Sequence, residues 1–137
     1  SWRRYSILML TGFEIITEDL SPFEEQEVLP LIVVGLRSKI GKSQAVTSSH
    51  ICKALEGRFG KYKLNPVKLR KIISTIRING ILQGLCSNSK GYYLAETDNE
   101  LQECIHSLSE RLRQQQMVVD ALEVQYKFKT EYERVNG

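Results

Sequence analysis

The residues of this 137-residue chain that could carry out chemistry are few and widely separated. They are three cysteines and two histidines: Cys52, Cys86, Cys104, His50 and His106. No two cysteines have Cys-x-x-Cys spacing, and neither histidine belongs to a recognisable arrangement with a cysteine, serine or carboxylate. The pattern predicts buried, reduced thiols and argues against a metal site. We therefore expect a non-enzymatic protein with no cofactor and no small-molecule ligand.

One glycine-containing segment is similar to a phosphate-binding loop but departs from it in spacing. An apolar run, Leu31 to Gly35, leads towards Gly41-Lys42-Ser43. A phosphate-binding loop has four residues between its glycines before Gly-Lys-Ser/Thr, whereas five separate Gly35 from Gly41. No acidic strand end follows that could hold magnesium. Nucleotide binding through Gly41-Lys42-Ser43 is therefore kept only as a minor alternative.

Basic residues are concentrated in the middle of the chain, although the formal net charge is only +3. Residues 37–95 contain twelve lysines and arginines and one acidic residue, Glu56. The flanking segments 1–36 and 96–137 each carry a net charge of −4. This distribution is the electrostatic footprint of a surface that binds a polyanion such as nucleic acid. The apolar runs Ile7 to Leu10 and Leu31 to Gly35 are far shorter than the roughly 20 residues of a membrane span, so no membrane contact is expected.

Two helices are expected before the most basic part of the chain. Ser21-Pro22-Phe23-Glu24 has the Ser-x-x-Glu pattern of a capping box and predicts a helix over residues 22–40. Pro30 should kink this helix, because proline removes a backbone hydrogen bond. Thr47 predicts the cap of a second helix, over residues 48–56.

A third helix is expected over residues 66–79, capped by Asn65. Its aliphatic residues follow the i, i+3, i+4, i+7 rule and predict a buried side: Leu69, Ile72, Ile73 and Ile76. Residues 81–86 and 92–95 predict two strands around the turn 87–91, and Ala45-Val46 is a possible two-residue strand.

The order helix, short strand, helix, helix, β-hairpin predicts a mainly α (α+β) winged helix-turn-helix with a two-stranded wing. We expect an arm over residues 1–20, a DNA-binding domain over 21–95, and a long C-terminal helix within 96–137. In this arrangement helix 66–79 enters a major groove, and the tip of the hairpin contacts an adjacent groove or the backbone. The expected DNA-binding residues are Lys61, Lys63, Lys68, Arg70, Lys71, Ser74, Thr75, Arg77, Asn88, Ser89 and Lys90.

Two aromatic residues, Phe59 and Tyr62, lie among the basic residues of the loop 58–64. Such interleaving occurs in proteins that stack aromatic rings on the bases of single strands. The favoured interpretation is that both rings pack back on the core.

The C-terminal helix is expected to begin after a cap at Asp98 and to continue past Tyr132. Apolar residues alternate at spacings of four and three, with one polar interruption at Gln115, which is a heptad pattern. The helix either folds back along the first helix or pairs with a second chain. We favour a homodimer through Leu108, Leu112, Val119, Leu122 and Tyr126.

From about Pro22 to Leu122 the chain resembles the small winged-helix proteins encoded by phages, prophages and mobile elements. Five segments carry the resemblance: Gly35-Leu-Arg-Ser-Lys-Ile-Gly41-Lys42, Ala45-Val46-Thr47, Lys71-Ile-Ile-Ser-Thr-Ile-Arg77 with Gly80-Ile81, Ser87-x-Ser89-Lys90-Gly91-Tyr92-Tyr93, and Glu100-Leu101 with Ser107-Leu108 and Arg111. The resemblance implies a helix-turn-helix DNA-binding fold, a role in phage gene control or replication, and residence in the cytoplasm of a bacterial host. It implies no operator sequence and no catalytic residues.

The sequence thus predicts a regulator of transcription or replication that binds double-stranded DNA. The alternative is a winged helix used for protein contacts, which recruits replication proteins or other partners. Charge reversal at Arg70 and Lys71 distinguishes the two, because it should abolish DNA binding and leave capture of a protein partner intact.

Overall fold

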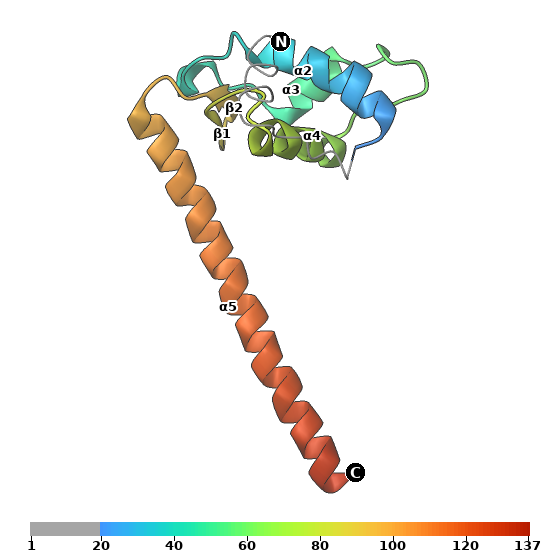
Figure 1. The fold of residues 1–137 in the computed structure, drawn as a ribbon, viewed down its shortest axis with the longest axis vertical. Helices are drawn as coiled ribbons and strands as arrows, with labels where there is room; N and C mark the ends of the chain where they lie inside the picture. Colours follow the sequence, from blue (N-terminus) through green and yellow to red (C-terminus); the bar gives the residue numbers. More distant parts are fainter. Residues whose placement is uncertain (1–19) are drawn as a thin grey trace. The chain divides into compact units, whose positions relative to one another are not determined.

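The computed structural model describes residues 20–137, so the arm expected over residues 1–20 lies outside this part except for Leu20. The chain is mainly helical, with a small antiparallel sheet and a long C-terminal helix (Figure 1). It forms two compact units that meet between Leu101 and Gln102. The elements are a π-helical turn η1 (Glu24–Val28), α2 (Leu29–Leu36), a 3₁₀ turn η2 (Lys42–Gln44), α3 (Ser48–Ala54), α4 (Pro66–Ile78), β1 (Leu85–Asn88), β2 (Gly91–Leu94) and α5 (Asp98–Asn136).

The capping box at the start of the first helix is confirmed. The Glu24 backbone N–H donates to Ser21 Oγ at 3.1 Å, and the Ser21 N–H donates to Glu24 Oε1 at 2.9 Å. The π-helical turn η1 immediately precedes α2, and Pro30 lies in the first turn of α2, while the kink expected at Pro30 stays a prediction. The helix ends at Leu36 and not near Ile40, so that part of the prediction is wrong.

The early end of α2 frees its following residues to pair with the hairpin. Ile40 forms a parallel bridge with Leu94, and the Leu94 N–H donates to the Lys39 carbonyl at 2.7 Å. Val46 and Tyr92 then exchange two backbone hydrogen bonds, at 2.9 and 2.8 Å. The short strand expected at Ala45-Val46 is therefore a single bridging residue.

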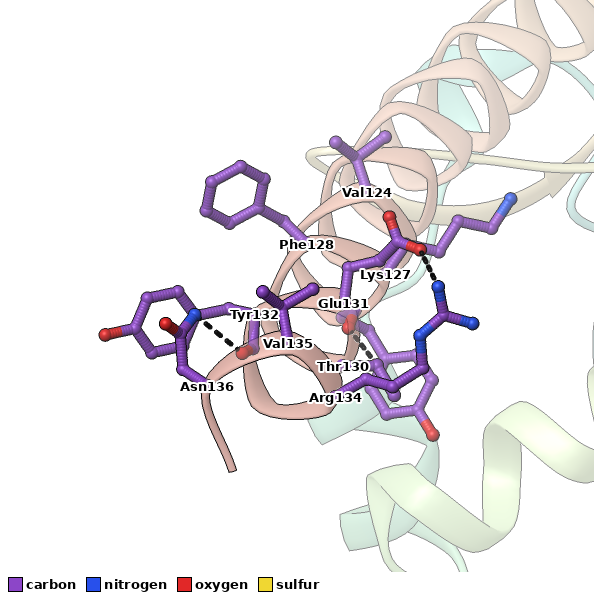
Figure 2. Close-up of a pocket in the computed structure, with 10 residues that line it drawn as sticks. Val124, Lys127, Phe128, Thr130, Glu131, Tyr132, Arg134, Val135 and Asn136 are labelled. Carbon is purple, nitrogen blue, oxygen red and sulfur yellow. Dashed lines mark hydrogen bonds and ion pairs between the residues drawn. The ribbon is translucent and has the colours of Figure 1, made fainter.

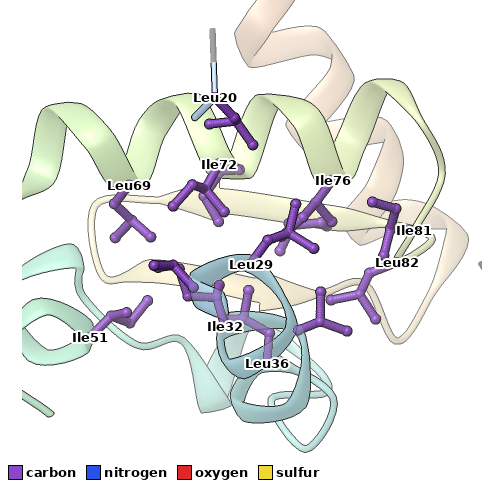
Figure 3. Close-up of a cluster of buried hydrophobic side chains, with 14 of the residues drawn as sticks. Leu20, Leu29, Ile32, Leu36, Ile51, Leu69, Ile72, Ile76, Ile81 and Leu82 are labelled. Atoms are coloured by element: carbon purple, nitrogen blue, oxygen red, sulfur yellow. The ribbon is translucent and has the colours of Figure 1, made fainter. Parts of the chain in front are cut away.

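The predicted caps of α3 and α4 are both present. Thr47 Oγ1 accepts from the His50 N–H at 3.1 Å, and Asn65 Oδ1 accepts from the Lys68 N–H at 2.8 Å. The four aliphatic residues expected on the inner side of α4 are fully buried. In the core of the first unit they meet side chains of α2, α3 and the segment after α4, including Leu29, Ile32, Leu36, Ile51, Ile81 and Leu82 (Figure 3).

The second strand of the hairpin lies within one residue of its expected position, but the first strand begins four residues later than expected. β1 begins at Leu85, and the register pairs Leu85 with Leu94 and Asn88 with Gly91. Ile81 and Leu82, which were expected in the first strand, are buried in the core without pairing. Their apolar character reflects this packing against α4 and α2, and the strand prediction over 81–84 is wrong.

The long helix is present over residues 98–136, and its cap is Thr97 where Asp98 was expected. Thr97 Oγ1 accepts from the Glu100 N–H at 3.1 Å. The Glu100 carboxylate in turn accepts from the backbone N–H groups of Glu96 at 2.8 Å and Lys42 at 3.3 Å. These contacts, those of Glu96 above all, lower the pKa of Glu100. Within residues 20–137, no helix combines the length and apolarity that crossing a membrane requires.

Gly91 begins β2 at a point where the chain leaves no room for a side chain. Its φ is +120°, and a Cβ atom at this position would collide with the carbonyl group of Val46. Gly57 also has a positive φ, of +75°, but has open space around it. Substitutions at these two glycines can therefore separate the cost of a strained backbone from the cost of a steric clash.

We expect Gly91→Ala to destabilise the protein far more than Gly57→Ala. The cost of a positive φ, about 1 kcal/mol, applies to both variants. Only Gly91→Ala also breaks the Val46–Tyr92 pairing, for a total of at least about 3 kcal/mol. Urea unfolding followed by circular dichroism measures both values. Equal losses for the two variants would contradict the close approach at Gly91.

Candidate nucleic-acid interface

The solvent-facing side of α4 is the best-defined part of the expected interface. Arg70, Lys71 and Ser74 are exposed, because they lie opposite the buried aliphatic residues at the helical period. Val67 and Ile78 are on the exposed part of the same helix, with 55% and 57% of their surface accessible. This side of α4 thus offers two cations and a hydroxyl, flanked by two apolar groups.

Two expected DNA-binding residues of α4 have structural roles. Thr75 is buried, and its hydroxyl donates to the Lys71 carbonyl at 3.0 Å, so it cannot reach a ligand. Arg77 is half-buried, and its Nε donates to the Leu85 carbonyl at 2.8 Å. Its Nη2 also donates to Ser87 Oγ at 3.2 Å, which fastens β1 to α4. The burial of Thr75 contradicts its predicted contact with DNA, whereas Arg77 is half-buried and engaged through Nε and Nη2, and its contact with DNA stays a prediction.

A third expected residue, Lys68, is held against the loop that precedes α4. Its Nζ lies 4.5 Å from the centroid of the Tyr62 ring and donates to the Lys63 carbonyl at 3.2 Å. A cation over an aromatic face is attracted by the electron density of the ring. Lys68 therefore shapes the loop that carries the exposed Lys61 and Lys63.

The aromatic rings of this loop pack inward, as favoured from the sequence. Phe59 lies edge-on to Phe23 and to Tyr62, with a centroid distance of 5.9 Å in each case. Phe59 and Tyr62 are both partly buried against the core. Their packing against Phe23 and the core leaves Lys61 and Lys63 as charged groups of this loop that face solvent.

A hydrogen bond ties the same loop to the start of the first helix. Tyr62 Oη donates to Glu24 Oε2 at 2.7 Å. Burial raises the pKa of Tyr62, and the bond to the Glu24 carboxylate raises it further. For Glu24, burial acts to raise the pKa, but hydrogen bonds from Ser21 and Tyr62 and the charge of Lys68 outweigh it, so the pKa is lowered.

The turn between β1 and β2 presents the remaining expected residues to solvent. Asn88, Ser89 and Lys90 are exposed. The Asn88 Oδ1 accepts from the Lys90 N–H at 2.8 Å, which closes the turn from within. The side-chain oxygen of Asn88 is therefore engaged. The side-chain nitrogen of Asn88 and the side chains of Ser89 and Lys90 give the tip its polar surface.

Three exposed polar residues on α3 were absent from the expected DNA-binding set: Ser49, His50 and Lys53. α3 packs against α4, so these side chains belong to the same unit as the interface. Their exposure follows from the burial of Ile51, and helical spacing from that residue could have identified them.

Two backbone donors of the segment similar to a phosphate-binding loop are occupied within the protein. The Gly41 N–H donates to the Leu94 carbonyl at 2.7 Å, and the Lys42 N–H donates to the Glu100 carboxylate. A phosphate loop needs such N–H groups directed at its ligand. Gly41 and Lys42 instead join the hairpin and the start of α5.

The cysteines are free thiols, as expected, with Cys86 and Cys104 buried and Cys52 half-buried. Burial raises the pKa of the Cys52 thiol, which lowers its reactivity. Across residues 20–137, no three His, Cys, Asp or Glu side chains gather as metal ligands would. The exposed cations are thus the main chemical feature of the first unit.

We expect Tyr62→Phe to lower stability by about 1 kcal/mol near pH 7, because the Glu24 carboxylate loses a donor. A carboxyl group with a lowered folded-state pKa contributes stability above its unfolded pKa of about 4.3 and loses it as pH falls through the folded value. The gap between the two proteins should therefore close as the pH falls from 5 to 3. Urea midpoints across this range measure it, and a gap that stays constant at all pH values would contradict the linkage.

No protein-family model matches this chain, and comparison with curated proteins and with solved structures finds no significant similarity. The function is therefore proposed from the exposed side chains, their charges and the elements that hold them.

Proposed function

We propose that residues 21–95 form a winged helix-turn-helix that binds double-stranded DNA without catalysis. α3 and α4 are the helix pair, and the hairpin β1–β2 is the wing. The observation that carries the proposal is the outer side of α4, where Arg70, Lys71 and Ser74 face solvent on a helix that contains no acidic residue. The surrounding segment 37–95, with twelve basic residues against one acidic, supports it.

In this proposal the basic side chains neutralise phosphates, and α4 supplies the contacts to bases. Arginine and lysine fix the protein on the duplex, whereas hydroxyl and apolar groups read base edges in the major groove. Ser74 can bond to a base edge, and Val67 and Ile78 can meet thymine methyl groups. Lys61, Lys63 and the turn residues 88–90 add contacts beside the helix.

Thr75 and Arg77 are not part of the proposed contact surface, because both side chains are engaged inside the protein. Lys68 acts on the surface indirectly, by holding the loop that carries Lys61 and Lys63. The resemblance to winged-helix proteins of phages extends the proposal to the control of transcription or replication of a phage or mobile element in a bacterial cytoplasm.

We expect the double variant Arg70→Ala, Lys71→Ala to lose affinity for mixed-sequence duplex. Each lost phosphate contact should also reduce the slope of log K against log salt by about 1. The matched control is Lys127→Ala, Arg134→Ala on α5, which removes one lysine and one arginine from exposed positions of the other unit. Fluorescence anisotropy over a salt series measures both.

The proposal fails if the unsubstituted protein shows no salt-sensitive binding at low ionic strength. It also fails if the α4 and α5 variants lose affinity equally, because net charge alone would then account for the binding.

The second candidate is a winged helix that docks on a protein, and the exposure of Val67 and Ile78 favours it. The fully buried centre of a protein–protein interface is more apolar than its rim, and exposed Val67 and Ile78 could supply such a centre. Val67→Ser with Ile78→Ser should then abolish capture of a replication protein, whereas charge reversal at Arg70 and Lys71 should leave it intact. Pull-down of the partner protein with the two variants tests this candidate. If the protein instead acts by binding DNA, charge reversal at Arg70 and Lys71 should abolish its binding.

A further inference from the structure

α5 carries an apolar stripe along one side that is open to solvent. Its seven apolar members have 37% to 70% of their surface accessible: Leu101, Ile105, Leu108, Leu112, Val119, Leu122 and Tyr126. With Gln115 they alternate at spacings of four and three over residues 101–126. That is nearly four heptads, the length at which such a repeat indicates a coiled coil.

We propose that two copies of this chain pair through α5 as a parallel, in-register, two-stranded coiled coil over residues 101–126. The proposal is independent of DNA binding, because it concerns the second unit and the end of the first. At about 1.5 Å per residue the paired segment is roughly 40 Å long.

The residue types at the two core positions favour two strands over three or four. In heptad notation, Ile105, Leu112, Val119 and Tyr126 occupy position a. Leucine occupies position d at 101, 108 and 122. Two of the four a residues, Ile105 and Val119, are β-branched, and β-branched residues at a combined with leucine at d favour parallel dimers.

Gln115, the polar member of the stripe, selects the parallel orientation and the register. It occupies position d, and in a parallel in-register pair it faces Gln115 of the second copy, where the two amides can bond to each other. In an antiparallel pair a d residue faces an a residue of the other helix, and those are Ile105, Leu112, Val119 and Tyr126. The amide would then be buried without a partner, which costs about 1–3 kcal/mol for each polar group.

The charges beside the stripe do not oppose this pairing. In a parallel pair, a residue at g lies near the residue five positions later in the other helix, at e. Arg111 then meets Gln116, and Val118 meets Glu123, so no like charges face each other. The pairing ends after Tyr126, because the next core positions are Lys129 and Glu133, which would face their own copies.

A second apolar stripe lies on the opposite side of α5 but begins only at Met117. It includes Val124, Phe128 and Val135, whose side chains project from the last turns of the helix (Figure 2). Before Met117 the same side of the helix carries the polar residues Glu110 and Gln114, so this second stripe is shorter than three heptads. It therefore serves as a matched comparison for the longer stripe.

The test compares Leu122→Glu with Val124→Glu in the full chain by sedimentation equilibrium. Leu122 is 57% and Val124 66% exposed, two residues apart on the same helix but on opposite sides, so both variants should keep the fold. The unsubstituted protein and Val124→Glu should have twice the 15.7 kDa of one chain. Leu122→Glu should dimerise at least about a hundredfold more weakly, because a charge would enter the core of the pair.

A monomeric unsubstituted protein at 100 μM, a trimer or tetramer, or a dimer lost in Val124→Glu and kept in Leu122→Glu would each overturn the proposal. Circular dichroism of both variants checks that the helices are intact.

Orientation is tested by Leu122→Cys under mild oxidation, with Val124→Cys and the unsubstituted chain as controls. A parallel in-register pair brings residue 122 next to its own copy, so Leu122→Cys should give a disulfide-linked dimer that neither control gives. Gln115→Leu should raise the melting temperature of the dimer. No cross-link at 122, or a lower melting temperature for Gln115→Leu, would contradict the proposed orientation and the role of the amide.

Discussion

The burial of one side of α4 constrains the rest of the first unit. Leu69, Ile72, Ile73 and Ile76 have at most 1% of their surface accessible, and their spacing fixes the rotation of the helix about its axis. Because that rotation is fixed, so are the residues that reach solvent, and the basic outer side is a consequence of the apolar inner side. A single polar residue in the inner set would weaken both the core and the presentation of Arg70 and Lys71.

Much of this was predictable from the sequence because helical periodicity and caps act locally. The inner side of α4, the caps at Asn65 and Thr47 and the box at Ser21 all follow from residues within one or two turns of each other. The same reasoning was less successful at the edges of the inner side. Thr75 and Arg77 are polar residues on the border, and only the position of β1 and the Lys71 carbonyl decides that both turn inward.

The hairpin and the end of α2 were harder to predict because they depend on contacts distant in sequence. Ile40 leaves the helical pattern to pair with Leu94, more than fifty residues later. Ile81 and Leu82 have the composition of a strand, but they are core residues of a connection. A short run of apolar residues indicates that the segment is buried. It does not by itself indicate whether the buried backbone is a helix, a strand or a loop.

The close approach at Gly91 has a consequence for how this protein could change over time. Position 91 tolerates no side chain, since the backbone of Val46 occupies the space, yet the three residues immediately before it point into solvent. Position 91 is thus restricted to glycine, whereas the tip of the hairpin can vary in sequence. New side chains at 89 or 90 could change the surface of the turn without disturbing the core, whereas Asn88 is also needed to close the turn through its bond to the Lys90 N–H.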